Sequence, residues 1–171
     1  QLDSEGKVIG GQKAAGAKSA GVPGYVAGLL YALENYGTMS IADIVAPTIE
    51  LARKGFTVTP TFANDMGNSY DKLMKYSESG KIFLKDVDGM RLPYEVGEIF
   101  VNEDYAKTLE LIADGGHDAF YKGEIAQAMV DAHQKYGGLL TMEDLANYQV
   151  EVMEPVHGTY RGYDIYSSPS P

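Results

Sequence analysis

The fold of this chain is decided by residues 102–138, which read NEDYAKTLELIADGGHDAFYKGEIAQAMVDAHQKYGG. In the first half of this stretch, Tyr105, Leu109 and Ile112 recur at the i, i+4 and i+7 spacing that places side chains on one face of an α-helix. Asn102 stands before this pattern and is a suitable N-cap, because its side chain can accept a bond from a free N–H group of the first turn. The pattern therefore predicts an amphipathic helix that begins after Asn102.

The second half of the stretch predicts another helix. Its apolar positions repeat at i, i+3, i+4, i+7 and i+11, and they are Ile125, Ala128, Met129, Ala132 and Tyr136. Paired glycines at 115–116 and 137–138 are expected to end the first and the second helix, since glycine readily adopts the left-handed conformation found there. The turn between the helices is expected to be anchored by Phe120 and Tyr121. We predict a core whose mostly buried, mutually contacting residues are Leu109, Ile112, Phe120, Ile125 and Met129.

Further elements are expected on either side of this helical pair. They are a helix over 23–35, a helix over 41–54 with Ser40 as its N-cap and Gly55 at its end, a strand over 56–61, a helix over 62–76, a hairpin turn at Asp86-Val87-Asp88-Gly89, a short capped helix starting at Thr141, and two strands over 149–156 and 160–166 joined around His157-Gly158. Residues 1–18 show no sustained period and are expected to form an irregular entry segment. The predicted fold class is α+β: a helix-rich segment over 19–171 with a hairpin and a short C-terminal β pair.

The composition excludes several functional classes. The chain has 171 residues and 44% hydrophobic content, enough to bury the core of one domain. Its formal net charge of −10 would repel a phosphate backbone, so nucleic acid is not an expected partner. No apolar run approaches the ~20 residues that a membrane-spanning helix needs. Because the chain has no cysteine, disulfides, thiolate nucleophiles and cysteine metal sites are excluded.

Two short patterns partly match known functional motifs. Ser69-Tyr70-Asp71-Lys72 matches the S-x-x-K nucleophile motif, but Ser4-Glu5-Gly6-Lys7 matches it as well and the accompanying S-D-N and K-T-G motifs are absent, so a solvated helical Lys72 is favoured. The acidic residues from Asp86 to Glu95 fit several positions of a calcium loop, but Leu84 occupies its first position, and a hairpin turn explains the same residues.

The histidines indicate no metal site. His117, His133 and His157 share no metal-ligand spacing, and His133 is expected on the polar surface of its helix. No G-x-S-x-G elbow occurs. From its residues alone, the sequence names no catalytic residue, no cofactor-binding residue, no metal ligand and no cofactor.

Blocks of residues nevertheless resemble a known family over nearly the full length from about Ser19. They are Gly21-Val22-Pro23-Gly24 with Gly28; Tyr36-Gly37; Pro47 with Leu51-Ala52 and Gly55-Phe56; Leu109 with Ile112-Ala113; Phe120-Tyr121-Lys122-Gly123 with Ile125-Ala126; Gly137-Gly138-Leu139 with Glu143-Asp144-Leu145 and Tyr148; and Tyr160-Arg161-Gly162-Tyr163 with Ser167 and Pro169. In this order and spacing they resemble the central part of the large subunit of γ-glutamyltransferases (γ-glutamyl transpeptidases).

The resemblance implies a segment of an N-terminal nucleophile hydrolase of the αββα type. In that family a precursor cuts itself, and the threonine exposed at the new N-terminus of the small subunit takes the γ-glutamyl group as an acyl-enzyme. The resemblance also implies the small catalytic subunit and the remainder of the large subunit as partners, a small-molecule or peptide γ-glutamyl substrate, and an exported location.

The family's functional residues are expected outside this chain. The R-E-x-A-P stretch would precede residue 1, and the P-P-P-S-S-G-G stretch would start near Pro169, where the chain reads Pro169-Ser170-Pro171. Both ends are therefore expected to be cuts in a longer polypeptide. Two same-fold alternatives remain open, a capsule poly-γ-glutamate transpeptidase and a cephalosporin acylase, together with a non-catalytic helical binding module whose acidic surface meets a basic protein.

Overall fold

The computed structural model describes residues 4–7 and 16–169. The chain divides into two compact units, residues 37–126 and residues 1–36 together with 127–171, and each is described by itself. Most of the expected irregular entry segment, residues 1–3 and 8–15, lies outside the described residues; Ala17–Ser19 form a 3-10 turn, η1.

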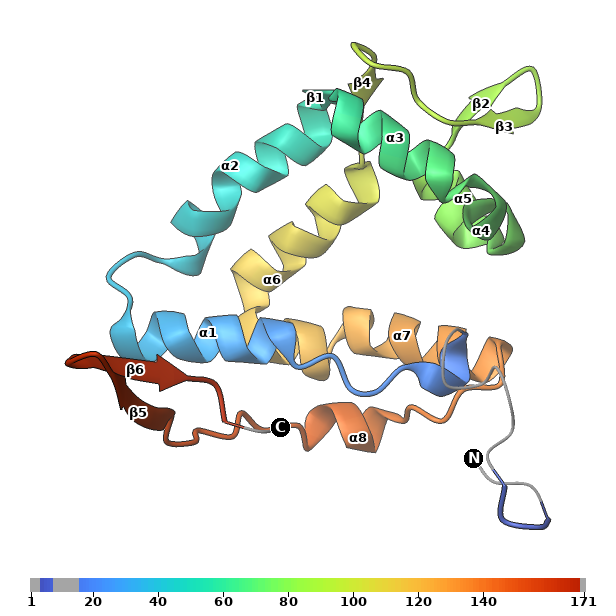
Figure 1. Cartoon of the computed structure of the whole chain (residues 1–171). Coiled ribbons are helices and arrows are strands. Elements are labelled where there is room, and N and C mark those ends of the chain that lie inside the picture. Colours follow the sequence, from blue (N-terminus) through green and yellow to red (C-terminus); the bar gives the residue numbers. More distant parts are fainter. Residues whose placement is uncertain (1–3, 8–15, 170–171) are drawn as a thin grey trace. The chain divides into compact units, whose positions relative to one another are not determined.

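The unit of residues 37–126 contains helices and two small antiparallel sheets (Figure 1). Its elements are α2 (Ile41–Lys54), β1 (Phe56–Thr57), α3 (Pro60–Asn68), α4 (Tyr70–Lys75), α5 (Ser77–Phe83), β2 (Lys85–Val87), β3 (Met90–Leu92), β4 (Ile99–Phe100) and α6 (Glu103–Tyr121). Strand β1 pairs with β4, and β2 pairs with β3.

The other unit contains three helices and one hairpin besides η1 among its described residues. They are α1 (Tyr25–Tyr36), α7 (Glu124–Lys135), whose first turn belongs to the preceding unit, α8 (Met142–Ala146), and the antiparallel pair β5 (Val156–Tyr160) and β6 (Tyr163–Ser167). The predicted helix-rich α+β class is thereby confirmed. Within the described residues, no helix is both long enough and apolar enough to cross a membrane.

Helices α2 and α6 pack against each other and form the framework of their unit (Figure 1). The predicted cap of α2 is confirmed, since the N–H group of Asp43 donates to Ser40 Oγ at 3.1 Å. The helix ends at Gly55 as predicted, and the backbone N–H of Asn102 donates to the carbonyl oxygen of Ala52 at 2.9 Å. This bond ties the start of α6 to the end of α2.

Helix α6 follows the prediction at its start and bends where a stop was predicted. Asn102 Oδ1 accepts the N–H of Tyr105 at 3.0 Å, so the N-cap is confirmed. Gly116 has φ 55° and ψ −137°, a conformation that interrupts the helix, and the chain then resumes helical geometry as far as Tyr121. The two glycines therefore end the straight part of the helix, and the final turn buries Tyr121 completely.

Helix α7 presents a different face from the predicted one. Ala126 and Val130 are buried, whereas Ala128, Ala132 and Tyr136 are exposed. The helix carries apolar residues on several faces, so the period alone did not fix which face packs. Its predicted end at the paired glycines is confirmed, because Gly137 N–H donates to Gln134 O at 3.3 Å and Gly138 N–H to His133 O at 2.6 Å.

Of the five residues predicted as a core, Ile112 is buried, and the other four, Leu109, Phe120, Ile125 and Met129, are half-buried. A core that the sequence did not indicate lies around β1 and β4. Val58, Met66 and Phe100 are buried there, and Phe56, Phe62 and Tyr94 pack around them with ring centroids 5.2–5.6 Å apart. Their edge-to-face and tilted arrangements are those that aromatic rings prefer.

The first predicted hairpin is confirmed. Strands β2 and β3 are joined by Asp88 and Gly89, both with positive φ, and Asp86 Oδ1 accepts the N–H of Gly89 at 3.0 Å. The single helix predicted over 62–76 and the strand predicted over 56–61 are wrong in extent. Three short helices, α3, α4 and α5, occupy residues 60–83, because Thr59 caps a helix at Pro60 and the chain turns again at Ser69 and Tyr76.

The C-terminal predictions are confirmed for the helix and corrected for the strands. Thr141 and Asp144 form a capping box at the start of α8. The two strands are β5 and β6, but residues 149–155 are not in a strand and the turn lies at Arg161-Gly162 rather than at His157-Gly158. Gly158 is inside β5, where it pairs with Ile165.

Candidate functional site

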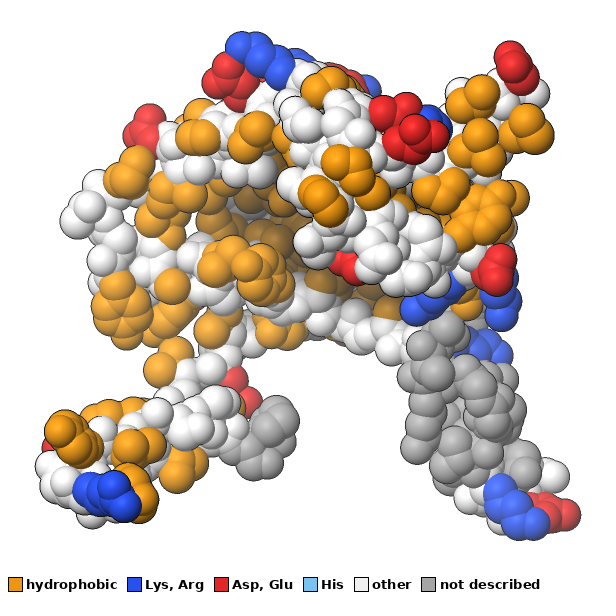
Figure 2. Space-filling model, turned by 45° about the horizontal axis from the view of Figure 1, so that its top comes forward, with side chains coloured by type: hydrophobic (Ala, Val, Ile, Leu, Met, Phe, Trp, Pro, Cys, Tyr) orange, Lys and Arg blue, Asp and Glu red, His pale blue; other side chains and the backbone are white. Residues whose placement is uncertain are grey.

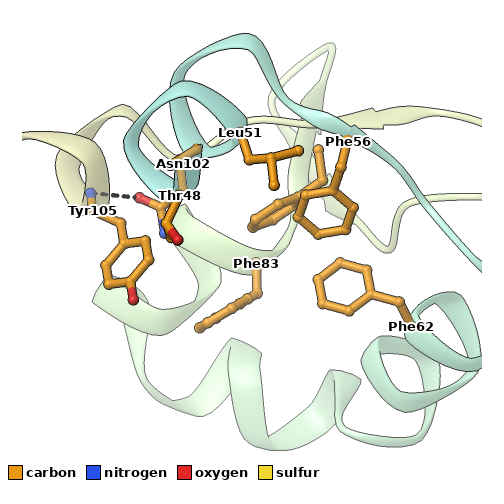
Figure 3. A pocket seen from close by; sticks show the side chains of 9 residues that line it. Thr48, Leu51, Phe56, Phe62, Phe83, Asn102 and Tyr105 are labelled. Atoms are coloured by element: carbon orange, nitrogen blue, oxygen red, sulfur yellow. Dashed lines mark hydrogen bonds between the residues drawn. The ribbon is translucent and has the colours of Figure 1, made fainter. Parts of the chain in front are cut away.

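A pocket of about 430 Å³ opens between α2, α5 and α6 in the unit of residues 37–126 (Figure 3). Its lining residues are Thr48, Leu51, Ala52, Phe56, Phe62, Phe83, Phe100, Asn102 and Tyr105. Leu51, Phe56, Phe62 and Phe83 surround the space from separate elements, and the ring of Phe83 stacks on that of Phe100 with centroids 6.1 Å apart. The wall of the pocket is therefore mainly aromatic and aliphatic.

The polar groups of this pocket do not form a catalytic arrangement. Asn102 Oδ1 already accepts the N–H of Tyr105 as the cap of α6. The remaining polar side chains are the hydroxyls of Thr48 and Tyr105, and none of the lining residues is a carboxylate, histidine or lysine. Without a base beside either hydroxyl, the pocket can hold apolar groups but offers no activated nucleophile.

A charged cluster in this unit joins α2 to α6. Arg53 Nη1 lies 2.8 Å from Glu110 Oε1, and Arg53 Nε lies 3.3 Å from Glu103 Oε1. The hydrogen bond from Arg53 lowers the pKa of Glu110, and the same bond raises the pKa of Arg53. All three side chains are more than a third exposed, so solvent screening weakens the ion pairs, which help to hold the helix pair together.

The three histidines are in separate surroundings. His117 Nδ1 lies 3.4 Å from Asp118 Oδ1, and its ring stacks on Tyr121. His157 Nε2 lies 2.8 Å from Asp164 Oδ1 on the β5–β6 hairpin. His133 was predicted on the polar surface of its helix, but its Nδ1 atom is buried. This atom has no hydrogen-bond partner among the described residues. The backbone at Gly138 lies against this ring, because a Cβ atom added there would be 2.3 Å from His133 Nδ1. Helical periodicity does not predict this contact.

The S-x-x-K match at residues 69–72 and the acidic residues from Asp86 to Glu95 do not form a functional site among the described residues. Lys72 is exposed on α4, as expected for a solvated helical residue, and Ser69 is exposed where α3 ends and α4 begins. Asp86 turns its carboxylate to the Gly89 N–H and to Arg91, at 3.0 and 3.6 Å. Within residues 4–7 and 16–169, no group of three histidine or acidic side chains is arranged to hold a metal ion.

Comparison with known proteins decides the family. The family model described as "Gamma-glutamyltranspeptidase" matches residues 1–171, the whole chain. The chain belongs to the γ-glutamyltranspeptidase family. Over 171 residues, 99% of this chain, it is 40% identical to the "Glutathione hydrolase proenzyme" of Escherichia coli strain K12, of which it covers 29%.

Two further likenesses bear on fold and substrate. The crystal structure of Helicobacter pylori γ-glutamyltranspeptidase matches with a TM-score of 0.92 and 39% identity, covering 98% of this chain and 47% of that one. The "Acylase ACY 1 proenzyme" of Pseudomonas sp. strain SE83 is 38% identical over 160 residues, 94% of this chain and 28% of the acylase. This chain thus spans less than a third of the proenzymes that it resembles and less than half of the chain in that crystal structure.

Proposed function

We propose that this chain is a large-subunit segment, with an entry segment at residues 1–18 and the helix-rich part over 19–171, of an enzyme that hydrolyses or transfers γ-glutamyl groups. The observation that carries the proposal is the 40% identity to a glutathione hydrolase proenzyme over 99% of the chain. The fold supports it, since the Helicobacter pylori γ-glutamyltranspeptidase has the same arrangement over 98% of the chain.

In the proposed enzyme, the nucleophile is the N-terminal threonine of a small subunit released by self-cleavage. Its own amine accepts the proton of the hydroxyl, and the hydroxyl oxygen attacks the γ-glutamyl carbonyl. The amine then gives that proton to the leaving nitrogen, the C–N bond breaks and an acyl-enzyme remains. Water then yields glutamate, whereas an amino acid or peptide yields a new γ-glutamyl compound. Backbone N–H groups stabilise the oxyanion of each tetrahedral intermediate.

The contribution of this chain to that enzyme is structural. Its described residues form an apolar pocket, a helix pair and a hairpin. We assign no catalytic, cofactor-binding or metal-binding residue to this chain. The proposed partners are the small catalytic subunit and the remainder of the large subunit. We place the enzyme outside the cytoplasm, on the basis of the family resemblance of the sequence.

The experiment that tests the function uses the full gene that contains this segment. The product should cut itself into two subunits and release 4-nitroaniline from γ-glutamyl-4-nitroanilide, with glutathione as a competing substrate. Replacement of the new N-terminal threonine by alanine should abolish both cleavage and turnover. A protein that processes but acts only on poly-γ-glutamate would assign the capsule transpeptidase alternative. One that acts only on a cephalosporin side-chain amide would assign the cephalosporin acylase alternative, the name carried by a Bacillus halodurans structure that this chain resembles.

A further inference from the structure

Exposed apolar side chains occur on much of the described surface. Figure 2 shows that they gather in several groups, so exposure by itself does not single out a binding site. The pocket between α2, α5 and α6 differs from these groups because it is concave, with a volume of about 430 Å³. Small-molecule pockets in proteins measure about 300–1,000 Å³, and most of their lining is hydrophobic and aromatic. This pocket therefore has the size and the lining of a small-molecule site.

The pocket combines protected and accessible lining residues. Phe100 and Ala52 are 5% and 9% exposed, whereas Leu51, Tyr105 and Phe83 are 53%, 48% and 37% exposed. A ligand can therefore enter past the exposed side chains and lie against the buried ones. Apolar surface that is removed from water in this way favours binding.

The walls of the pocket are held in place by contacts within the protein. The rings of Phe56, Phe62 and Phe100 pack against one another with centroids 5.2–5.6 Å apart. The N–H group of Asn102 donates to the Ala52 carbonyl oxygen at 2.9 Å, which joins α2 to α6 beside the pocket. Because these contacts do not depend on an occupant, a ligand would find a preformed site, and less free energy is lost to ordering on binding.

The lining favours a neutral and aromatic ligand. The rings of Phe83 and Phe100 are nearly parallel, with 11° between their planes, and they supply flat apolar surface to the wall. None of the nine lining residues carries a charge. A charged group inside the pocket would lose its hydration without gaining a partner, which is strongly unfavourable. The pocket therefore selects flat, uncharged rings.

Polar side chains on one side of the pocket add a second requirement. Figure 3 shows Thr48, Asn102 and Tyr105 together on one side, and Phe56 and Phe62 on the other. Asn102 caps α6, whereas no hydrogen bond between described residues involves the hydroxyl of Thr48 or Tyr105. These two hydroxyls are free to bond to a polar group on a ligand whose ring lies among the phenylalanines.

We propose that this pocket binds a neutral aromatic molecule that carries one hydrogen-bonding group. The ring of the ligand lies among Phe56, Phe62 and Phe83, and its polar group bonds to the hydroxyl of Thr48 or Tyr105. The pocket is not suited to a γ-glutamyl group, which carries a charged α-amino group and a charged α-carboxylate, because the lining offers no opposite charge to either.

Two dyes with the same anilinonaphthalene skeleton test the ligand class in the full processed protein. N-phenyl-1-naphthylamine is neutral and has one N–H donor, whereas 1-anilinonaphthalene-8-sulfonate carries an added sulfonate charge. Both fluoresce more strongly in apolar surroundings, so each is titrated by fluorescence. The neutral dye should saturate a single site, and the anionic dye should bind at least about tenfold more weakly, because its charge has no partner in the pocket.

Two results of these titrations would overturn the proposal. The first is equal affinity of the two dyes, which would show that the site does not select against charge. The second is the absence of saturable binding of the neutral dye, which is the result expected if another segment of the processed protein fills the pocket.

Two substitutions on α2 test the location of the site. Leu51→Trp places a larger side chain in the pocket, and Ile44→Trp is the matched control, because Ile44 is 43% exposed on the same helix and does not line the pocket. Leu51→Trp should weaken the neutral dye at least about tenfold by steric overlap, and Ile44→Trp should leave its affinity unchanged. Equal affinities for these two variants would overturn the assignment to this pocket.

Variants of other elements give independent readings. Phe83→Ala removes a wall contributed by α5 and should also weaken the neutral dye, so the test does not depend on α2 alone. Thr48→Val and Tyr105→Phe remove the hydroxyls with little change in size. One of them should weaken the neutral dye by roughly 2- to 10-fold, and unchanged affinity in both would overturn the proposed hydrogen bond. Far-ultraviolet circular dichroism establishes that each variant is folded.

Release of 4-nitroaniline from γ-glutamyl-4-nitroanilide is measured on the same samples. An active enzyme that does not bind the neutral dye refutes the proposed aromatic ligand alone. A processed but inactive protein that binds the neutral dye in this pocket refutes the proposed function alone.

Discussion

Substitution of Gly55 by alanine tests the junction on which the α2–α6 framework depends. Gly55 ends α2 with φ 83° and ψ 168°, and its N–H donates to the Leu51 carbonyl oxygen at 2.8 Å. A Cβ atom at this position would lie 2.5 Å from Ile99 Cγ2 and 2.8 Å from the Phe100 carbonyl oxygen. The side chain of an alanine therefore meets both an unfavourable backbone conformation and the neighbouring strand β4.

The magnitude follows from these two effects. A backbone conformation that is essentially restricted to glycine costs about 1–3 kcal/mol when another residue adopts it. Insertion of a methyl group against packed atoms costs about 1–3 kcal/mol more, because Ile99 or the backbone of β4 must move. We expect Gly55→Ala to lower the free energy of unfolding by about 2–6 kcal/mol.

Gly89 provides a matched control on the β2–β3 turn. Its φ is 81°, close to that of Gly55, but an added Cβ would meet nothing within 4 Å. Gly89→Ala should therefore show the backbone effect alone, about 1–2 kcal/mol. The assay is urea unfolding monitored by far-ultraviolet circular dichroism. Both variants and the unmodified chain are compared with the same dependence of the unfolding free energy on urea concentration. Equal losses for the two variants would show that contact with β4 does not constrain Gly55.

Three further substitutions are expected to have distinct effects. Tyr121→Ala should destabilise the chain by about 3–5 kcal/mol, because this side chain is 0% exposed, whereas Tyr36→Ala, at 78% exposed, should leave the midpoint of urea unfolding almost unchanged. Arg53→Met should lower the melting temperature at neutral pH and low salt. The bond from Arg53 lowers the pKa of Glu110, so the ion pair stabilises the fold above the ordinary glutamate pKa and is lost as pH falls through the lowered pKa. The difference in melting temperature between Arg53→Met and the unmodified chain should therefore shrink below about pH 4 and at high salt. A difference in melting temperature that persists under both conditions would contradict the ion-pair assignment. Thr141→Ala should cost about 1 kcal/mol by removing the cap of α8, and Thr141→Ser should restore most of it; a serine variant as unstable as the alanine variant would contradict a capping role.

Helix caps and the first hairpin could be predicted because their causes are local. Asn102, Ser40 and Thr141 each cap a helix through a side-chain oxygen that bonds to an N–H group three residues later. The Asp88-Gly89 turn likewise depends on the conformational freedom of two adjacent residues. Such signals are complete within a few residues of sequence, so no knowledge of distant packing is needed.

Which face of α7 is buried could not be predicted, because its cause is not local. Residues 125–132 read IAQAMVDA, and apolar side chains occur on more than one face of the helix. The predicted face contained Ala128 and Ala132, but packing buries Ala126 and Val130. The choice between these faces is made by neighbours that are distant in the sequence, and alanine gives only a weak preference because it buries little surface.

The turn of the second hairpin was misplaced and the pocket was missed for related reasons. His157-Gly158 and Arg161-Gly162 are both two-residue glycine signals, and only the pairing of Tyr160 with Tyr163 selects the latter as the turn. The pocket combines Leu51, Phe56 and Phe83 from three different elements. Spacing in the sequence carries no signal for such a site, because the residues meet only after the chain has folded.

The last prediction is that the 171-residue chain, purified alone, neither hydrolyses nor transfers a γ-glutamyl group. Acyl transfer requires a nucleophile and a base within hydrogen-bonding distance of each other. His157 bonds to Asp164, and His117 bonds to Asp118, but no serine or threonine hydroxyl among the described residues bonds to a histidine ring. The pocket also lacks a base. In the proposed enzyme the nucleophilic threonine belongs to another segment, and loss of a nucleophile removes several orders of magnitude of rate.

The measurement is release of 4-nitroaniline from γ-glutamyl-4-nitroanilide by the purified chain, beside the full processed protein. The chain should be indistinguishable from buffer, and the processed protein should be active. Circular dichroism of the same sample establishes that the chain is helical, so that inactivity is not the result of unfolding. Turnover by the chain that survives repurification and is abolished by His157→Ala would place a catalytic group on the β5–β6 hairpin. In that case the His157–Asp164 pair would take part in the chemistry, because it is the one histidine–carboxylate contact shorter than 3 Å among the described residues.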